Sequence, residues 1–197
     1  MVSPGASPWQ RALGDSVAEL HPRLLAYFSA IPAGCIGRGT GSFDSVGTPR
    51  RWLWPVLAIL ARRGILFPVW ERDVPFRIEN RPVGEALQAV RTFRFAAGER
   101  TMVDAVSIDA RGLVDRLGTA GQLAVDMTAT VVDGALRLTS GAARWRGRRL
   151  PLAPRLQLTE RFDDLAGRQH VALTLESRIF GRIYEYSGHF DYRIDAS

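Results

Sequence analysis

The chain has 197 residues, of which 46% are hydrophobic, and a formal net charge of +6. This length and composition fit one folded domain with a well-buried core. Every basic residue is an arginine, which excludes a Schiff-base lysine and a phosphate-loop lysine.

The single cysteine, Cys35, excludes an internal disulfide and a zinc site built from several cysteines. The N-terminus has no apolar core of signal-peptide length. No apolar run reaches the roughly 18 residues that cross a bilayer. We therefore expect a cytoplasmic protein without a transmembrane segment.

The N-terminal part predicts a lead-in followed by a helix. Proline, serine and glycine are frequent at the start, so we expect a flexible lead-in over residues 1–14 and a single domain over 15–197. Apolar residues then recur at helical spacing to about Ser29. Pro22 belongs in a first helical turn, so the helix begins either near Asp15 or at Pro22.

Residues 35–47 are rich in glycine. Their spacing is G-x-G-x-G rather than the G-x-G-x-x-G of dinucleotide-binding loops, and no strand precedes them. We expect a glycine-rich strand or bulge packed close to another backbone, with nucleotide binding as the alternative.

Residues 52–60 predict a short, very apolar second helix, with Pro55 in its first turn and Arg62-Arg63-Gly64 at its end. We expect this helix to plug one mouth of a sheet, where it could act as a lid over a ligand. The alternative, given arginines at both ends, is a helix that lies on a membrane surface.

From residue 69 onward, apolar and polar residues alternate along about nine strands separated by short turns. Residues 169–194 form the last pair of strands, and this pair has one buried side. In the first strand, alternate residues from Val171 to Ile179 share a face. In the second strand, alternate residues from Tyr184 to Ile194 share a face. We expect an α+β fold, in which two N-terminal helices pack on a large curved antiparallel sheet that forms a half-barrel or near-closed barrel.

Two inward-facing features are candidates for chemistry. Arg91 and Arg94 lie on opposite faces of one strand, so one of them points inward and needs a carboxylate. Glu160 and Glu79 are the candidate partners. A buried Arg–Glu pair would either hold a ligand's anionic group or close the sheet as a structural ion pair.

An aromatic stripe on the last strand either lines a ligand site or fills the core. The ligand-binding candidates are Arg91, Phe93, Glu160, Tyr184, Tyr186 and Trp54. The three histidines lack metal-binding spacing, so no metal site and no cofactor are expected. The basic run over residues 144–149 contains one aromatic residue, so we expect no nucleic-acid binding.

Short motifs occur in a fixed order along most of the chain: Gly37-Arg38-Gly39, Arg91-Thr92-Phe93, Gly112-Leu113, Leu150-Pro151, and an ending that runs from Phe180 to Gly188. This order resembles a bacterial family called domain of unknown function 4166. The family has no established activity. Some members are fused behind a module similar to saccharopine dehydrogenase, so the resemblance implies an oxidoreductase as a partner.

The sequence therefore predicts a non-enzymatic module that binds a small apolar or amphipathic ligand between sheet and helices. Two alternatives stay open. One is a cyclase- or isomerase-like enzyme that uses the same cavity with unassigned catalytic residues. The other is a docking domain for a redox enzyme, which would show a flat apolar patch and no cavity.

Overall fold

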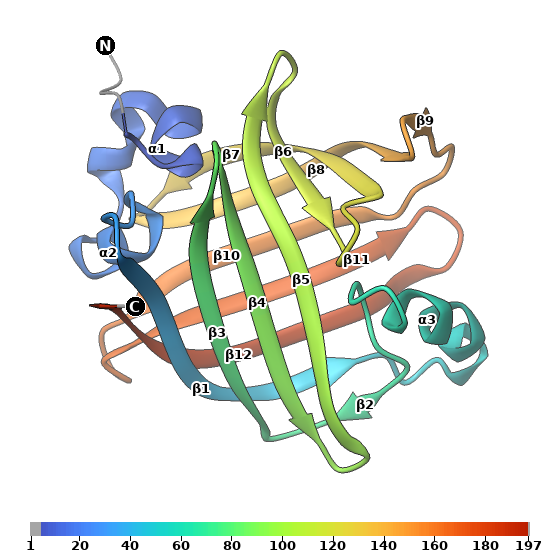
Figure 1. Cartoon of the computed structure of the whole chain (residues 1–197). Coiled ribbons are helices and arrows are strands. Elements are labelled where there is room, and N and C mark those ends of the chain that lie inside the picture. Colours follow the sequence, from blue (N-terminus) through green and yellow to red (C-terminus); the bar gives the residue numbers. More distant parts are fainter. Residues whose placement is uncertain (1–4, 197) are drawn as a thin grey trace.

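Alternating side chains along most of the chain close into an antiparallel β-barrel, as seen in a computed structural model that describes residues 5–196 (Figure 1). Ten strands form its wall: β1 Cys35–Gly47, β3 Val74–Val83, β4 Ala86–Phe95, β5 Gly98–Asp109, β6 Gly112–Leu117, β7 Leu123–Val132, β8 Ala135–Trp145, β10 Arg155–Asp163, β11 Arg168–Ser177 and β12 Gly181–Ala196. Two short strands, β2 Trp70–Glu71 and β9 Arg148–Arg149, pair with β1 and β8.

Two long-range pairings complete the circle. The first barrel strand lies antiparallel to the last, with Gly39 opposite Tyr192. β8 pairs with β10, with Leu138 opposite Leu158. Because every wall strand then has two neighbours, the barrel has no long open edge. The predicted curved sheet is confirmed, and it is fully closed.

The glycine-rich segment is a strand whose glycines face the barrel interior. A β-carbon added to Gly37 would overlap the ring of Tyr192, and one added to Gly41 would overlap the backbone at Phe190. These glycines let aromatic side chains of β12 lie directly on β1. The predicted close backbone approach is confirmed.

The N-terminal helical region differs from the prediction. Two short helices, α1 Pro8–Leu13 and α2 Leu25–Phe28, are linked by 3-10 turns at Gly14–Glu19 and Pro22–Leu24. The single helix expected from about Asp15 to Ser29 is wrong, because a proline at position 22 cannot continue a helix. The alternative start at Pro22 is confirmed, although the chain begins there with a 3-10 turn that leads into α2. Of the expected lead-in, residues 1–4 lie outside the described residues.

This helical region covers one end of the barrel (Figure 1). Trp9, Tyr27 and Phe28 are buried there. The rings of Trp9 and Phe28 meet edge-on with centroids 5.7 Å apart. Tyr27 also contacts the ring of Phe190 on β12. The α1–α2 region therefore closes this end with aromatic side chains.

The second predicted helix is present as α3 Trp54–Ala61, with Pro55 in its first turn. It lies at the opposite end of the barrel (Figure 1). Leu57 is its buried residue, while Val56 and Ile59 are exposed. No helix in the described part of the chain is long and apolar enough to span a bilayer.

Candidate functional site

The barrel encloses a cavity of about 410 Å³. Its walls are mainly apolar, because the alternation of each strand places leucine, valine and methionine side chains on the inner face. Trp9 and Tyr27 bound the cavity at the α1–α2 end. The apolar wall includes Met102, Val106, Leu123, Val125, Met127, Leu138, Leu158, Leu173 and Leu175.

The cavity reaches the surface at the other end of the barrel. Leu60, Ile65 and Leu66, which end α3 or follow it, line the cavity together with the loop over residues 150–154. Leu152 in that loop is 72% exposed. A residue that both lines the cavity and faces solvent marks its mouth.

Charged side chains lie inside the barrel on neighbouring strands. Arg91 on β4 forms an ion pair with Asp104 on β5. Only 18% of the Arg91 side chain and 4% of the Asp104 side chain are exposed. The expected partners were wrong: Glu160 also faces the cavity but has no ion pair with Arg91, and Glu79 pairs with Arg38 and Arg81 outside the barrel.

Glu160 lies on the inner face of β10 and is 6% exposed. It accepts a hydrogen bond from the Gln169 side-chain amide at 2.6 Å. Burial raises the pKa of Glu160 to about 7, against the opposing effects of the Arg91 charge and the Gln169 hydrogen bond. This carboxyl can therefore hold or release a proton near neutral pH.

Asp115 on β6 is the third interior carboxyl. Burial raises its pKa to about 6, although the Arg91 charge acts in the opposite direction. Its Oδ1 atom is buried and has no hydrogen-bond partner among the described residues. An unpartnered buried oxygen is unfavourable, so this atom is a place where a ligand's donor would be stabilised.

The interior thus contains one guanidinium and three carboxyl groups, Asp104, Asp115 and Glu160. The guanidinium is already engaged by Asp104. An added donor or cation would satisfy the other two carboxyls, whereas an added anion would meet like charges. The interior is therefore better suited to a hydroxyl or amine than to the anionic group considered from the sequence.

The comparison with protein families agrees with the order of motifs in the chain. The family model described as "Domain of unknown function (DUF4166)" matches residues 20–190.

The chain belongs to the DUF4166 family. No curated protein and no solved structure matches it significantly. The matched residues include all ten wall strands up to the C-terminal part of β12. The charged residues of the cavity, from Arg91 to Glu160, therefore lie within the DUF4166 domain, whereas Trp9 of its lining precedes the matched residues.

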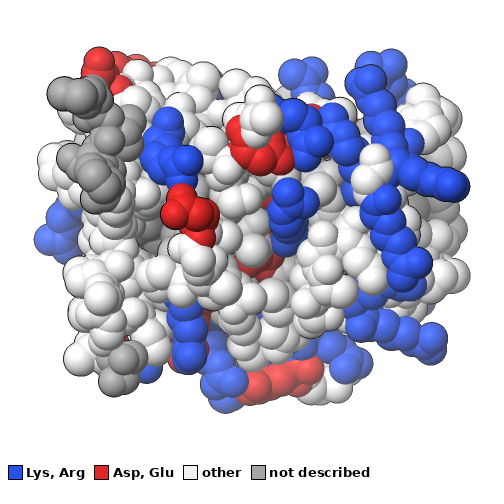
Figure 2. Space-filling model, turned by 45° about the horizontal axis from the view of Figure 1, so that its top comes forward, with Lys and Arg blue, Asp and Glu red and all other residues white. Residues whose placement is uncertain are grey.

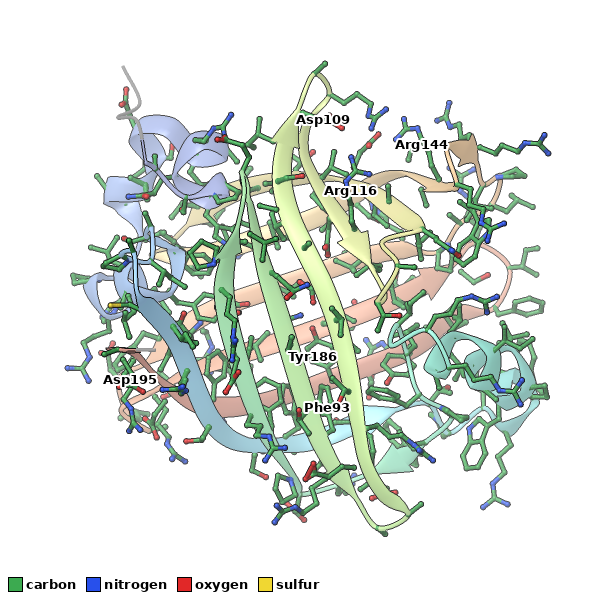
Figure 3. The ribbon with its side chains drawn as sticks, in the orientation of Figure 1. Phe93, Asp109, Arg116, Arg144, Tyr186 and Asp195 are labelled. Atoms are coloured by element: carbon green, nitrogen blue, oxygen red, sulfur yellow. The ribbon has the colours of Figure 1, made fainter. Side chains whose placement is uncertain are left out.

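The DUF4166 barrel brings only some of the predicted ligand residues together. Arg91, Glu160 and Tyr186 line the cavity. Phe93 lies instead in an aromatic core, 5.4 Å from Phe43 between ring centroids. Figure 3 shows Phe93 and Tyr186 in the middle of the barrel, and both contact Phe43.

The two other candidates lie away from the cavity lining. Tyr184 is 1% exposed and packs in the core cluster. Trp54 lies at the start of α3, where its indole N–H donates to the carbonyl of Thr48 at 3.4 Å. The aromatic stripe is therefore divided between core packing and cavity lining.

Sequence reasoning missed Asp104, Asp115 and Tyr27. A signal for the two aspartates exists, because each alternates with apolar residues on the inner face of its strand: Asp104 lies between Met102 and Val106, and Asp115 lies between Leu113 and Leu117. Tyr27 carries no comparable signal, because its position depends on how the N-terminal helices dock.

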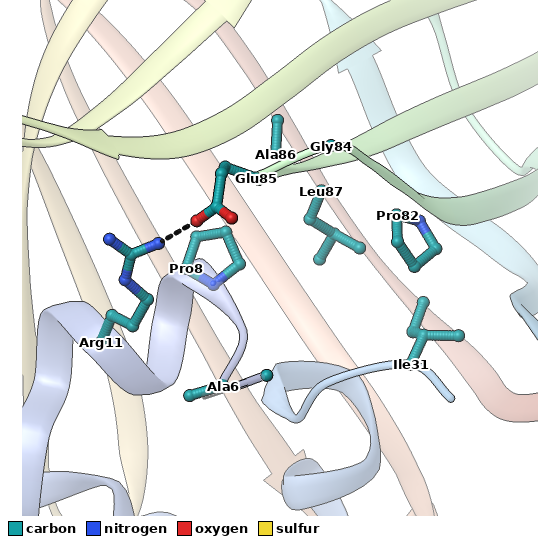
Figure 4. A pocket seen from close by; sticks show the side chains of 10 residues that line it. Ala6, Pro8, Arg11, Ile31, Pro82, Gly84, Glu85, Ala86 and Leu87 are labelled. Carbon is teal, nitrogen blue, oxygen red and sulfur yellow. Dashed lines mark hydrogen bonds and ion pairs between the residues drawn. The ribbon is translucent and has the colours of Figure 1, made fainter. Parts of the chain in front are cut away.

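A second hollow lies between the N-terminal helical region and the β3–β4 turn (Figure 4). It measures about 430 Å³. Arg11 of α1 bridges it by an ion pair with Glu85 at 2.9 Å. Its two charged lining residues are paired with each other, so this hollow has no charged group left to bind a ligand.

The histidines lie outside the cavity lining. His21 stacks on Phe162 with ring centroids 4.9 Å apart. His170 and His189 contact each other at 4.6 Å between ring centroids. Within residues 5–196, no three His, Cys, Asp or Glu side chains are grouped to bind a metal ion.

The outer surface of β5–β8 carries a network of ion pairs instead. Asp109 pairs with Arg111 and Arg116, and Asp126 pairs with Arg111 and Arg144. Figure 3 shows Asp109, Arg116 and Arg144 along this part of the barrel. The network links four neighbouring strands on the face that points away from the cavity.

Proposed function

We propose that the protein binds a small amphipathic molecule inside the barrel, with a hydrogen-bond-donating head group against Asp115 and Glu160. The observation that carries this proposal is an apolar cavity whose interior contains two incompletely compensated carboxyls. Small-molecule sites combine these features: apolar walls and a few converging polar groups.

The size of the cavity limits the ligand. At about 30 Å³ for each water-sized group, a cavity of about 410 Å³ holds roughly a dozen non-hydrogen atoms. The polar side chains that would bind the head group are those of Arg91, Asp115 and Glu160. The mouth of the cavity lies at the loop over residues 150–154. A ligand would therefore place its head group inward and its apolar part toward the mouth.

Blocking the cavity tests this proposal. Met127 lines the cavity on β7, whereas its neighbour Thr128 is exposed on the outer face. Met127→Trp fills space inside the barrel, and Thr128→Trp adds the same side chain outside. We expect a fluorescent hydrophobic dye to bind the wild type and the Thr128→Trp variant saturably, and to bind the Met127→Trp variant at least about tenfold more weakly.

Overpacking can also destabilise a core by about 1–3 kcal/mol, so the folded state of each variant is checked by its unfolding transition. The proposal fails if folded Met127→Trp binds the dye as tightly as Thr128→Trp does. It also fails if the wild type binds no dye and its barrel is filled by side chains alone.

An enzyme of the cyclase or isomerase type is the second candidate. The observation that favours it is Glu160, a carboxyl with a pKa of about 7 in a cavity that opens to solvent. A general acid or base works best with a pKa near the working pH. Turnover of a bound ligand by wild type, lost in Glu160→Gln with binding retained, would favour this function over simple binding.

Docking to a redox enzyme has less support. The expectation for that function was a flat apolar patch without a cavity, around Trp52 and Trp54. The barrel is hollow, and Trp54 is only partly exposed while Trp52 is 54% exposed. These features favour a ligand-binding barrel.

A further inference from the structure

Exposed apolar side chains are concentrated around the mouth of the cavity. Of the eleven large hydrophobic side chains that are exposed within residues 5–196, seven lie on three segments at this end. We call these segments the portal rim: residues 48–66, 145–156 and 177–183. The exposed side chains are Trp52, Val56, Ile59, Leu150, Leu152, Ile179 and Phe180.

The first two segments line the opening, and the third packs against the first. Trp52 of the first segment packs on Phe180 of the third, with ring centroids 4.8 Å apart. Leu60 and Leu66 of the first segment line the same cavity as Leu150 of the second. Figure 1 shows α3, β9 and the β11–β12 turn together at the end of the barrel opposite α1 and α2.

The charge of the portal rim is strongly one-sided. Its three segments contain ten arginines and no Asp or Glu, whereas the rest of the chain has sixteen arginines and twenty acidic residues. The net positive charge of the protein is therefore concentrated at the portal rim, where Arg182 is paired with Glu185 just outside the rim. Figure 2 shows basic side chains gathered along the edge of the molecule that contains this end. The ten are Arg50, Arg51, Arg62, Arg63, Arg146, Arg148, Arg149, Arg155, Arg178 and Arg182.

Two exposed rim residues, Arg146 and Leu152, have a strained backbone; Arg146, in the tight turn before β9, has a φ of 48°. Leu152 has a φ of 59°, in the left-handed region that leucine adopts unfavourably. It is 72% exposed, so the strain is not offset by burial within this chain. Strained exposed residues are typical of sites that contact something else.

We propose that the portal rim docks on an anionic phospholipid bilayer. Exposed tryptophan, phenylalanine, leucine and isoleucine can enter the boundary between head groups and acyl chains. The surrounding guanidinium groups can bind lipid phosphates. An acidic protein surface would satisfy the charges, but the apolar side chains protrude from separate turns around an opening rather than forming a flat face.

The position of the rim also favours a bilayer. Docking in this orientation would place the mouth of the apolar cavity against the acyl region, from which an amphipathic molecule could enter without crossing water. This docking does not depend on the proposed function, because the rim could bind a bilayer even if the cavity stayed empty.

Co-sedimentation with vesicles tests the docking. We expect the wild type to bind vesicles of equal parts phosphatidylglycerol and phosphatidylcholine at low salt, to bind phosphatidylcholine vesicles far more weakly, and to be released by salt. Arg148→Gln/Arg149→Gln should weaken partitioning about 30-fold, from about 1 kcal/mol for each arginine. Arg23→Gln/Arg137→Gln removes the same charge outside the rim and should have little effect.

Leu152→Asn separates docking from folding. Asparagine tolerates the left-handed conformation better than leucine does, so this variant should unfold at the same temperature or higher. It should nevertheless bind the anionic vesicles roughly tenfold more weakly, because an exposed apolar side chain is lost.

No binding of wild type to anionic vesicles at low salt overturns the docking proposal and leaves an acidic protein as the occupant of the rim. Equal losses in the Arg148→Gln/Arg149→Gln and Arg23→Gln/Arg137→Gln variants overturn it as well, because the attraction would then be general. Dye binding to the cavity is measured without vesicles, so failure of docking and failure of the proposed function are distinguishable.

Discussion

Arg91 holds the central position among the interior charges. Its ion pair with Asp104 neutralises one carboxylate, and its charge acts on Asp115 and Glu160 without neutralising them fully. Burial makes each uncompensated charge unfavourable. The buried carboxyls that destabilise the empty barrel would therefore stabilise a bound ligand that carries a hydrogen-bond donor.

Arg91→Met is expected to lower the free energy of unfolding by about 3–5 kcal/mol, because it leaves Asp104 buried without its partner. The double variant Arg91→Met/Asp104→Leu removes both charges and should recover much of that loss. Urea unfolding of the wild type, both single variants and the double variant measures the coupling. A double variant whose loss equals the sum of the single losses would show that the two side chains do not interact.

Glu160 should make stability depend on pH. The native carboxyl keeps its proton up to a pKa of about 7, whereas its ordinary pKa is 4.5. The native state therefore binds more protons than the unfolded state across this window, and stability falls as pH rises through it. The stabilising contribution is fully present below the ordinary pKa and lost above the raised one.

The Glu160→Gln variant should lack this part of the slope. As pH rises through the window, the wild type should lose about 3 kcal/mol of its free energy of unfolding that the Glu160→Gln variant does not lose. Urea unfolding at a series of pH values measures the difference. Glu79→Gln, on the outer surface, is the control and should show no such gain. Parallel curves for Glu160→Gln and wild type would contradict the raised pKa.

At the residue scale, the sequence predicts which side chains face inward but not which of them meet. Alternation along β4 predicted that either Arg91 or Arg94 faces inward, and the structure places Arg91 in the cavity lining together with Glu160. Their lack of an ion pair could not be predicted, because it depends on how far apart two non-neighbouring strands lie around the barrel. Asp104 sits on the strand next to Arg91 and could have been proposed from pairing alone.

Among the strands, the close packing of β1 against β12 depends on small residues in both strands. Gly188 on β12 lies against Phe43 of β1, and an added β-carbon would overlap the backbone there. The ring of Phe43 occupies the space that a side chain at position 188 would take. This complementarity fixes the register between the first and last strands of the barrel.

Gly188→Ala is therefore expected to lower the free energy of unfolding by about 1–3 kcal/mol through overpacking. Gly141→Ala on β8 is a matched control, because its added β-carbon would lie 3.5 Å from Asp126, an ordinary contact. Thermal unfolding of both variants measures the difference. Equal losses of stability in the two variants would show that position 188 does not require glycine for close packing against Phe43.

The short elements were harder to predict than the strands. Pro55 correctly marked the first turn of α3. Near residue 22 the apolar spacing continued through a proline, and the chain there breaks into two helices and two 3-10 turns. Apolar spacing records which side chains are buried, and a series of short turns can bury them as well as one helix.

At the scale of the whole molecule, closure converts a curved sheet into a container. About nine strands and strong curvature followed from the alternation. Closure itself depends on the pairing of β8 with β10, across a loop that contains β9. Pro151 and Pro154 near that loop indicate that the chain crosses there from one strand to another. They do not indicate which strand β10 pairs with. The hollow interior is a consequence of closure. The sequence could therefore predict some of the residues that line the cavity, but not the cavity itself.

The proposed ligand of the barrel is an amphiphile bound through a hydrogen-bond donor on its head group. Calorimetric titration with decan-1-ol, decylamine and decanoate, which share one chain length, distinguishes a donor from an anionic head group. At a pH about one unit above the pKa of Glu160, the alcohol and the amine should bind at least about tenfold more tightly than the carboxylate. Tightest binding by decanoate, or no binding by any of the three, would contradict the claim.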